Sequence, residues 1–157
     1  MVSRLLVIGL VACAVIAGVA VYWLQVYAYY DEVSAAEIGE ITLVPQDGGA
    51  AEPVAVSDFR GINSDSSPIR FRGCFRLDAT PESLAETYVE AENAEPLIAP
   101  GWFDCFDAAR IGADIENGTA RAFLSRRDIH PGVDRVIAVY PDGRAYAWHQ
   151  LNESAED

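Results

Sequence analysis

The sequence predicts an α+β protein, in which one N-terminal transmembrane helix precedes a small antiparallel sheet domain with about two helices. Three observations support this prediction. The chain begins with one long apolar run, several later segments alternate apolar and polar residues as half-buried strands do, and two segments carry helix-capping residues. The expected organisation is a transmembrane anchor at 1–30, a juxtamembrane linker at 31–39, an extracytoplasmic domain at 40–152 and a polar tail at 153–157.

The apolar run covers residues 5–24, which include no charge, amide or proline. At about 1.5 Å per residue, a helix of this length is about 30 Å long, which matches the hydrocarbon core of a bilayer. We therefore expect an uncleaved membrane anchor. Two alternatives are a signal peptide that is cleaved and a lipoprotein signal around Cys13. The bulky aromatic residues at the end of the run argue against the first, and the largely apolar stretch after Cys13 argues against the second.

The flanks of this run predict its orientation. Arg4 precedes it, whereas acidic residues follow it and no basic residue occurs before Arg60. Basic residues stay on the cytoplasmic side, so the expected arrangement in a bacterial inner membrane is a cytoplasmic N-terminus and a periplasmic domain. Aromatic residues favour the headgroup layer. Those expected at this membrane interface are Tyr22, Trp23, Tyr27, Tyr29 and Tyr30.

Small residues recur at every fourth position of the apolar run. Two such rows overlap, and they consist of Gly9, Cys13 and Ala17 and of Ala14 and Gly18. Small residues at this spacing allow two helices to approach closely, so the stripe predicts contact with other transmembrane subunits. The alternative is that alanine and glycine are simply common in membrane helices.

Alternation and turn residues mark the elements of the domain. Strands are expected at 40–45, 54–62, 69–77, 120–127, 133–140 and 145–151, with a tight turn at 141–144. One helix is expected from the cap Thr80 to about Val89, with Pro81 at its first position. A second is expected over 105–117, capped by Asp104. We expect both helices on one side of the sheet, and the arginines of 69–77 on the face away from the core.

The charge of the domain restricts its partners. All 24 acidic residues lie beyond residue 30, together with ten arginines, so residues 31–157 carry a formal charge of about −14. Such a charge argues against binding nucleic acid and against lying flat on an anionic leaflet. It suits a cationic partner instead.

Cys74 and Cys105 are the only cysteines of the domain. In an oxidising compartment two such cysteines indicate a disulfide, and two buried free thiols are the alternative. Their spacing does not fit a CxxC redox motif, haem attachment or a zinc site. The neighbouring Trp102, Phe103 and Phe106 are expected to pack as core around the bridge, with a patch for a partner as the alternative.

No residue pattern in the domain predicts catalysis. His130 and His149 could join Asp104, Asp128 or Asp134 around a metal only if the fold brought them together. The sequence has no nucleophile elbow, phosphate-binding loop or dinucleotide fingerprint. We therefore assign no catalytic, cofactor-binding or metal-binding residue and expect no enzyme activity and no cofactor.

Three glutamates repeat every four residues on the first expected helix of the domain. Glu82, Glu86 and Glu90 have no arginine among them, and like charges at this spacing destabilise a helix by about 0.2–0.5 kcal/mol per pair. The row suggests a docking surface for a cationic periplasmic protein, such as a small cytochrome. The alternative is a solvated face in an acidic chain.

Four blocks of the chain resemble a family of small bacterial single-pass membrane-anchored proteins of unknown function. The blocks are LQVYAYY at 24–30, SSPIRFRGCFRL at 66–77, APGWFDCFDA at 99–108 and GVDRVIAVYPDGRAYAWHQLN at 132–152. The resemblance covers most of the chain, including both domain cysteines. It implies an anchored extracytoplasmic domain, and it brings no activity, cofactor or catalytic residue.

These features together favour a non-catalytic accessory subunit of a larger inner-membrane complex, with a respiratory or photosynthetic assembly as the first expectation. The subunit would stabilise the complex or present the acidic docking surface. One alternative is a stand-alone, membrane-anchored periplasmic sensor or ligand-binding domain. A second is an anchored assembly chaperone or enzyme. A concave pocket with convergent polar groups would favour a sensor or an enzyme.

Overall fold

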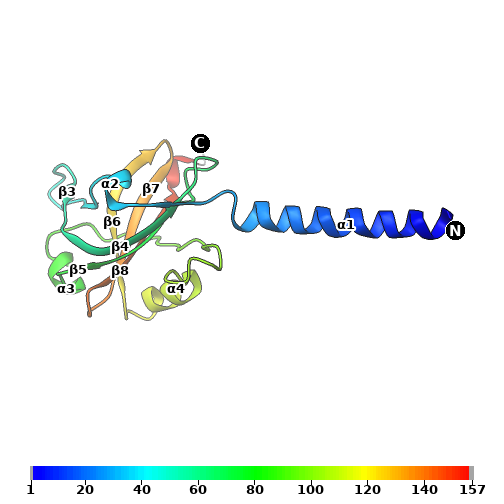
Figure 1. The fold of residues 1–157 in the computed structure, drawn as a ribbon. Coiled ribbons are helices and arrows are strands. Elements are labelled where there is room, and N and C mark those ends of the chain that lie inside the picture. Colours follow the sequence, from blue (N-terminus) through cyan, green and yellow to red (C-terminus); the bar gives the residue numbers. More distant parts are fainter. Residues whose placement is uncertain (1, 156–157) are drawn as a thin grey trace.

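A long N-terminal helix projects from a sheet domain in the computed structural model, which describes residues 2–155 (Figure 1). The helix, α1, covers Val2–Val26, and its 25 residues contain no proline that would interrupt the hydrogen bonds. Its side chains are exposed over nearly the whole length, and it is long and apolar enough to cross a membrane. The predicted N-terminal apolar helix is therefore confirmed.

The domain is built on one antiparallel sheet of six strands in the order β1-β4-β5-β8-β7-β6. Its strands are β1 (Asp31–Val33), β4 (Val56–Asn63), β5 (Arg72–Leu77), β6 (Arg121–His130), β7 (Val133–Val139) and β8 (Arg144–Leu151). A separate two-stranded ribbon consists of β2 (Thr42–Leu43) and β3 (Glu52–Pro53). The domain helices are α2 (Ala35–Ile38), α3 (Pro81–Ala85) and α4 (Ala108–Glu116), with a 3-10 turn, η1, at Glu153–Ala155. The predicted α+β architecture is confirmed.

Both faces of the sheet are buried, each against its own hydrophobic core. On β5, Phe75 and Leu77 belong to one core, whereas Cys74 points to the other, because successive residues of a strand face opposite ways. Leu84 of α3 packs in the first core and Ile111 of α4 packs in the second. The expectation that both helices lie on one side is therefore wrong. In Figure 1, α4 lies across the sheet from α2, whose Ile38 packs on the first core.

The segment predicted as a linker, 31–39, contains two short elements. Asp31 and Val33 of β1 pair with Asn63 and Gly61 of β4, which adds an edge strand to the sheet. The following helix α2 is capped by Ser34, whose backbone N–H donates to Glu37 Oε2 at 2.7 Å. The chain that leaves α1 thus joins the domain directly.

Both domain helices are shorter than predicted because their ends are drawn into other contacts. Helix α3 ends at Ala85, since Tyr88 and Glu90 form bridges with Pro45 and Phe123. Helix α4 is capped by Asp107, whose Oδ1 accepts from Arg110 N at 3.1 Å. The predicted cap at Asp104 is wrong.

The turn and the tail also have defined structures. Gly143, in the predicted 141–144 turn, has φ +82°, and a Cβ added there would lie 2.6 Å from the Leu77 carbonyl oxygen. Only glycine suits such a position without strain. Of the predicted polar tail, 153–155 form η1, and residues 156–157 lie outside the described part of the chain.

The predicted disulfide is present between Cys74 of β5 and Cys105 in the loop before α4. The two Cα atoms are 6.4 Å apart and the residues are separated by 31 positions. Phe103 and Phe106, on either side of Cys105, are buried in the same core as Cys74. The bridge therefore ties the long segment between α3 and α4 to the middle of the sheet.

Replacing Cys74 and Cys105 together with alanine should lower the free energy of unfolding of the domain by about 3–4 kcal/mol, as closure of a loop of this length predicts. The measurement is guanidinium unfolding of the full chain in detergent, followed by tryptophan fluorescence. Cys13→Ala is the matched control, since Cys13 is a free, exposed thiol on α1. An equal midpoint for all three proteins would contradict the prediction.

Candidate functional site

The end of α1 is bound by a side chain of the domain. Trp102, in the loop before α4, donates its indole N–H to the carbonyl oxygen of Val26 at 2.7 Å. Val26 is the last residue of α1, where backbone carbonyls lack partners within the helix. The Tyr27 ring stacks on Trp102 with 6.3 Å between the ring centroids. The domain thus completes the hydrogen bonding of the helix end.

A second contact holds the next turn of the chain. The guanidinium of Arg70 lies 5.4 Å from the ring centroids of both Tyr29 and Tyr30, within the range of a cation–π interaction. We call Tyr27, Tyr29, Tyr30, Arg70 and Trp102 the helix-exit contact. Its two separate attachments set the direction in which α1 leaves the domain.

The predicted interface aromatics therefore divide into two groups. Tyr22 and Trp23 lie on α1 itself with exposed rings. Tyr27, Tyr29 and Tyr30 follow the helix and contact the domain. Sequence reasoning missed Arg70 and the bond from Trp102, because nothing in a linear pattern brings residue 102 to residue 26. Phe103 and Phe106 form core as expected, whereas Trp102 is only partly buried.

Arg72 organises the loop that carries Trp102. It lies on β5 with only 3% of its surface exposed, although the sequence pattern predicted it on an open face. Its guanidinium donates to the carbonyl oxygens of Leu97 at 2.7 Å and Ile98 at 3.2 Å, and also to those of Ile69 and Phe71. Burial lowers the pKa of Arg72 to about 10, so it stays charged at neutral pH.

A buried polar pair lies at the same end of the sheet, on the opposite face. Arg135 of β7 donates from Nε to His149 Nε2 at 3.1 Å, and Arg135 also lies 4.6 Å from the Phe71 ring centroid. His149 Nδ1 lies 2.7 Å from the Pro68 carbonyl oxygen. Because Nε2 accepts, Nδ1 must carry the proton and donate to Pro68. The pair thus ties β7 and β8 to the loop before β5.

This pair is suited to holding structure rather than to proton transfer. Burial and the charge of Arg135 lower the pKa of His149 to about 3, far from the value of a useful general base at neutral pH. The ring of His130 lies 5.9 Å from that of His149, so the fold does bring the two histidines together.

The aspartates considered with these histidines have other partners. Asp128 and Asp134 both accept from Asn152 Nδ2, and Asp104 pairs with Arg60 on another part of the surface. Within residues 2–155 no group of three or more potential metal ligands occurs.

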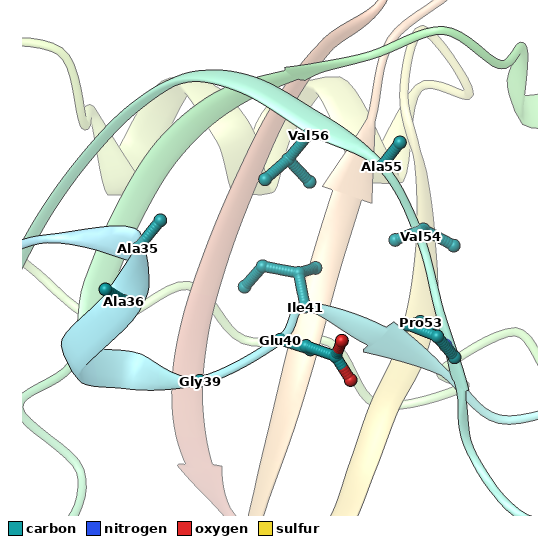
Figure 2. Close-up of a pocket in the computed structure, with 9 residues that line it drawn as sticks. All are labelled: Ala35, Ala36, Gly39, Glu40, Ile41, Pro53, Val54, Ala55 and Val56. Carbon is teal, nitrogen blue, oxygen red and sulfur yellow. The ribbon is translucent and has the colours of Figure 1, made fainter.

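An apolar groove of about 460 Å³ lies between α2 and the chain leading into β4. Figure 2 shows Ala35 and Ala36 on one side, the segment 53–56 on the other and Ile41 between them. Glu40 is the one ionisable side chain of its lining. A lone carboxylate without a neighbouring acid, base or nucleophile does not make a reaction site.

The remaining predicted sites lie apart from the helix-exit contact. The small-residue stripe on α1 faces open space, with no atom within 4 Å of a Cβ built on Gly9 or Gly18. The acidic row does not lie on one helix, because α3 ends before Glu86 and Glu90 lies beyond it. Glu90 also pairs with Arg121, so the row is not free of compensating charge as predicted.

The burial of neutral His149 predicts a specific pH dependence of stability. The unfolded chain takes up a proton near pH 6.5, whereas the folded chain does so only near pH 3. As the pH falls between these two values, the free energy of unfolding of the wild type should therefore decrease. This decrease should be steeper than that of His149→Gln by about 1.4 kcal/mol per pH unit. Urea unfolding of the full chain in detergent at pH 7, 6 and 5 measures both slopes. Parallel slopes for wild type and His149→Gln would refute this assignment.

Comparison with known proteins places the sheet domain in a family. A family model described as a family of unknown function (DUF6446) matches residues 41–157, which covers the domain apart from β1 and α2. Curated proteins and solved structures give no match. Since the match extends over more than half of the chain, the protein belongs to the DUF6446 family.

Proposed function

We propose that this protein is a non-catalytic accessory subunit of a larger membrane complex. In this proposal α1 spans a bacterial inner membrane and packs on transmembrane helices of the complex, while the domain stands on the periplasmic side. A respiratory or photosynthetic complex is the host that we favour. The observation that carries the proposal is the hydrogen bond from Trp102 to the Val26 carbonyl, together with the stacking of Tyr27 on Trp102.

The helix-exit contact supports this role because it joins membrane helix and domain without a free linker. A partner that binds α1 meets the domain in one orientation, since Trp102 and Arg70 hold the chain at two points. Such an arrangement lowers the cost of ordering the domain when the complex forms. A sensor that hangs from a flexible tether would have no need for it.

The surface of α1 agrees with a helix that has partners in the bilayer. Its small residues leave a shallow, unfilled stripe, and the helix contributes no packing to the domain core. Without a hydrophobic driving force in lipid, close packing over small residues is what joins membrane helices.

A stand-alone sensor is the second candidate, and the groove beside α2 is the observation that favours it. Its lining of small apolar side chains would suit an apolar ligand group, with Glu40 at its edge. A sensor of this kind would be recovered alone after gentle solubilisation, whereas an accessory subunit would migrate with its complex on a native gel.

The proposed acidic docking surface is smaller than the sequence predicted, because it includes two of the three glutamates. Glu82 and Glu86 are exposed and make no ion pair, whereas Glu90 is held by Arg121. A cationic periplasmic protein, such as a small cytochrome, would be attracted by these two carboxylates and by the overall charge of −13. At about 0.15 M salt the screening length is about 8 Å, so only charges close to the contact would act.

The orientation is tested by fusing reporters after Asp157. An alkaline phosphatase reporter, which is active only outside the cytoplasm, should give activity because Arg4 precedes the helix and acidic residues follow it. A fluorescent reporter that matures only in the cytoplasm serves as the control and should stay dark. The opposite pattern would reverse the proposed orientation.

Packing of α1 in the complex is tested with Gly18→Leu. The larger side chain fits the free protein, because nothing lies within 4 Å of a Cβ at this position, but it should hold a neighbouring helix away. We expect less of the complex to co-purify with the variant, while the circular dichroism of the domain is unchanged. The matched control is Ala12→Leu, on the other side of the helix. Equal recovery with Gly18→Leu would show that the stripe faces lipid.

A further inference from the structure

Few large apolar side chains of the domain are exposed, and those few gather near the end of α1. Beyond α1, the large hydrophobic residues that stay exposed in the described chain are Tyr27, Tyr29, Ile98 and Leu151. The two tyrosines belong to the helix-exit contact. Leu151 ends β8, three residues beyond Trp148, which pairs with Arg72 at the α1 end of the sheet. Ile98 is the most exposed of the four, at 83%.

Ile98 lies in a loop whose C-terminal end is bound to the end of α1. We call residues 96–102 the exit loop; its last residue, Trp102, binds the Val26 carbonyl. The apolar run ends two residues before Val26, which is about 3 Å along the helix axis, so Trp102 lies next to the hydrocarbon boundary if α1 spans. Four residues reach at most about 14 Å, so Ile98 lies within that distance of Trp102. Figure 1 shows the loop before α4 on the side of the domain that faces α1.

Part of the exit-loop backbone has hydrogen-bond partners within the protein. The carbonyl oxygens of Leu97 and Ile98 accept hydrogen bonds from the buried guanidinium of Arg72. Pro96 and Pro100 have no N–H to satisfy. Carbonyls left without partners would be costly in a lipid environment, and those of Leu97 and Ile98 have their partner inside the protein. The same bonds hold the loop in place, so the exposed side chain of Ile98 is presented in a fixed position.

We propose that the exit loop inserts Ile98 into the outer part of the bilayer that α1 spans, giving the domain a second contact with the membrane. The inference rests on the proposed placement of α1. The contact is apolar, and the domain is strongly acidic, so the lipid surface that it fits is zwitterionic rather than anionic.

The test uses the full chain in phosphatidylcholine nanodiscs, with an environment-sensitive dye on single cysteines. Wild-type Cys13 serves as the marker for α1, because the two domain cysteines are in the disulfide. In a Cys13→Ala background, Ile98→Cys reports on the exit loop. Asp142→Cys, in the turn at the opposite end of the sheet, is the matched control for any affinity of the dye itself for lipid. Nitroxide groups placed along the lipid chains, some near the headgroup and some near the chain ends, quench any dye that reaches them.

We expect a blue-shifted emission and loss of intensity through lipid quenching for the dyes at Cys13 and Ile98→Cys, and neither effect at Asp142→Cys. A quenched Cys13 dye with an Ile98→Cys dye that behaves like the control would overturn the inference and leave the membrane anchor intact. An unquenched Cys13 dye would overturn the anchor and the inference together. A dye at Ile98→Cys that is shifted but escapes the lipid quencher would indicate contact with protein and would also reject lipid insertion.

Discussion

The burial of the sheet on both faces is the constraint on which the rest of the domain depends. Phe75 and Leu77 of β5 point into one core and Cys74 points into the other, and β7 and β8 divide their residues in the same way. A strand of this kind needs a covering layer on each side. The segment between α3 and α4 supplies the second layer, and the Cys74–Cys105 bridge holds it there.

The second layer also explains how the domain contacts α1. Because Cys105, Phe103 and Phe106 are fixed against the sheet, the neighbouring Trp102 reaches Val26 from a rigid base. Arg72 stabilises the same segment through its carbonyl groups, and its buried charge is tolerable because these acceptors surround it. Core, bridge and helix exit are therefore directly connected to one another.

Arg72 and Arg135, which are both buried at the end of the sheet nearest α1, have different contacts. Arg72 is held by four backbone carbonyls, whereas Arg135 packs on Phe71 and donates to a neutral histidine. Within residues 2–155 neither is paired with a carboxylate. Although the chain has many acidic residues, both guanidinium groups are therefore used in contacts with carbonyls, a ring and a histidine. The acidic side chains stay at the surface.

The sequence by itself determined the long apolar helix, the antiparallel α+β class, the hairpin turn at Gly143 and the disulfide, because each depends on local composition, periodicity or cysteine count. Only the tertiary structure decided that α3 and α4 cover opposite faces, that Glu90 pairs with Arg121 and that Trp102 binds Val26. The linker predicted at 31–39 missed both α2 and β1. The S-x-x-E pattern at Ser34 is a local signal that could have indicated α2, whereas β1 had no such signal, since its three residues become a strand only by pairing with β4. Contacts between residues far apart in the chain depend on how the layers stack, and no local pattern records that.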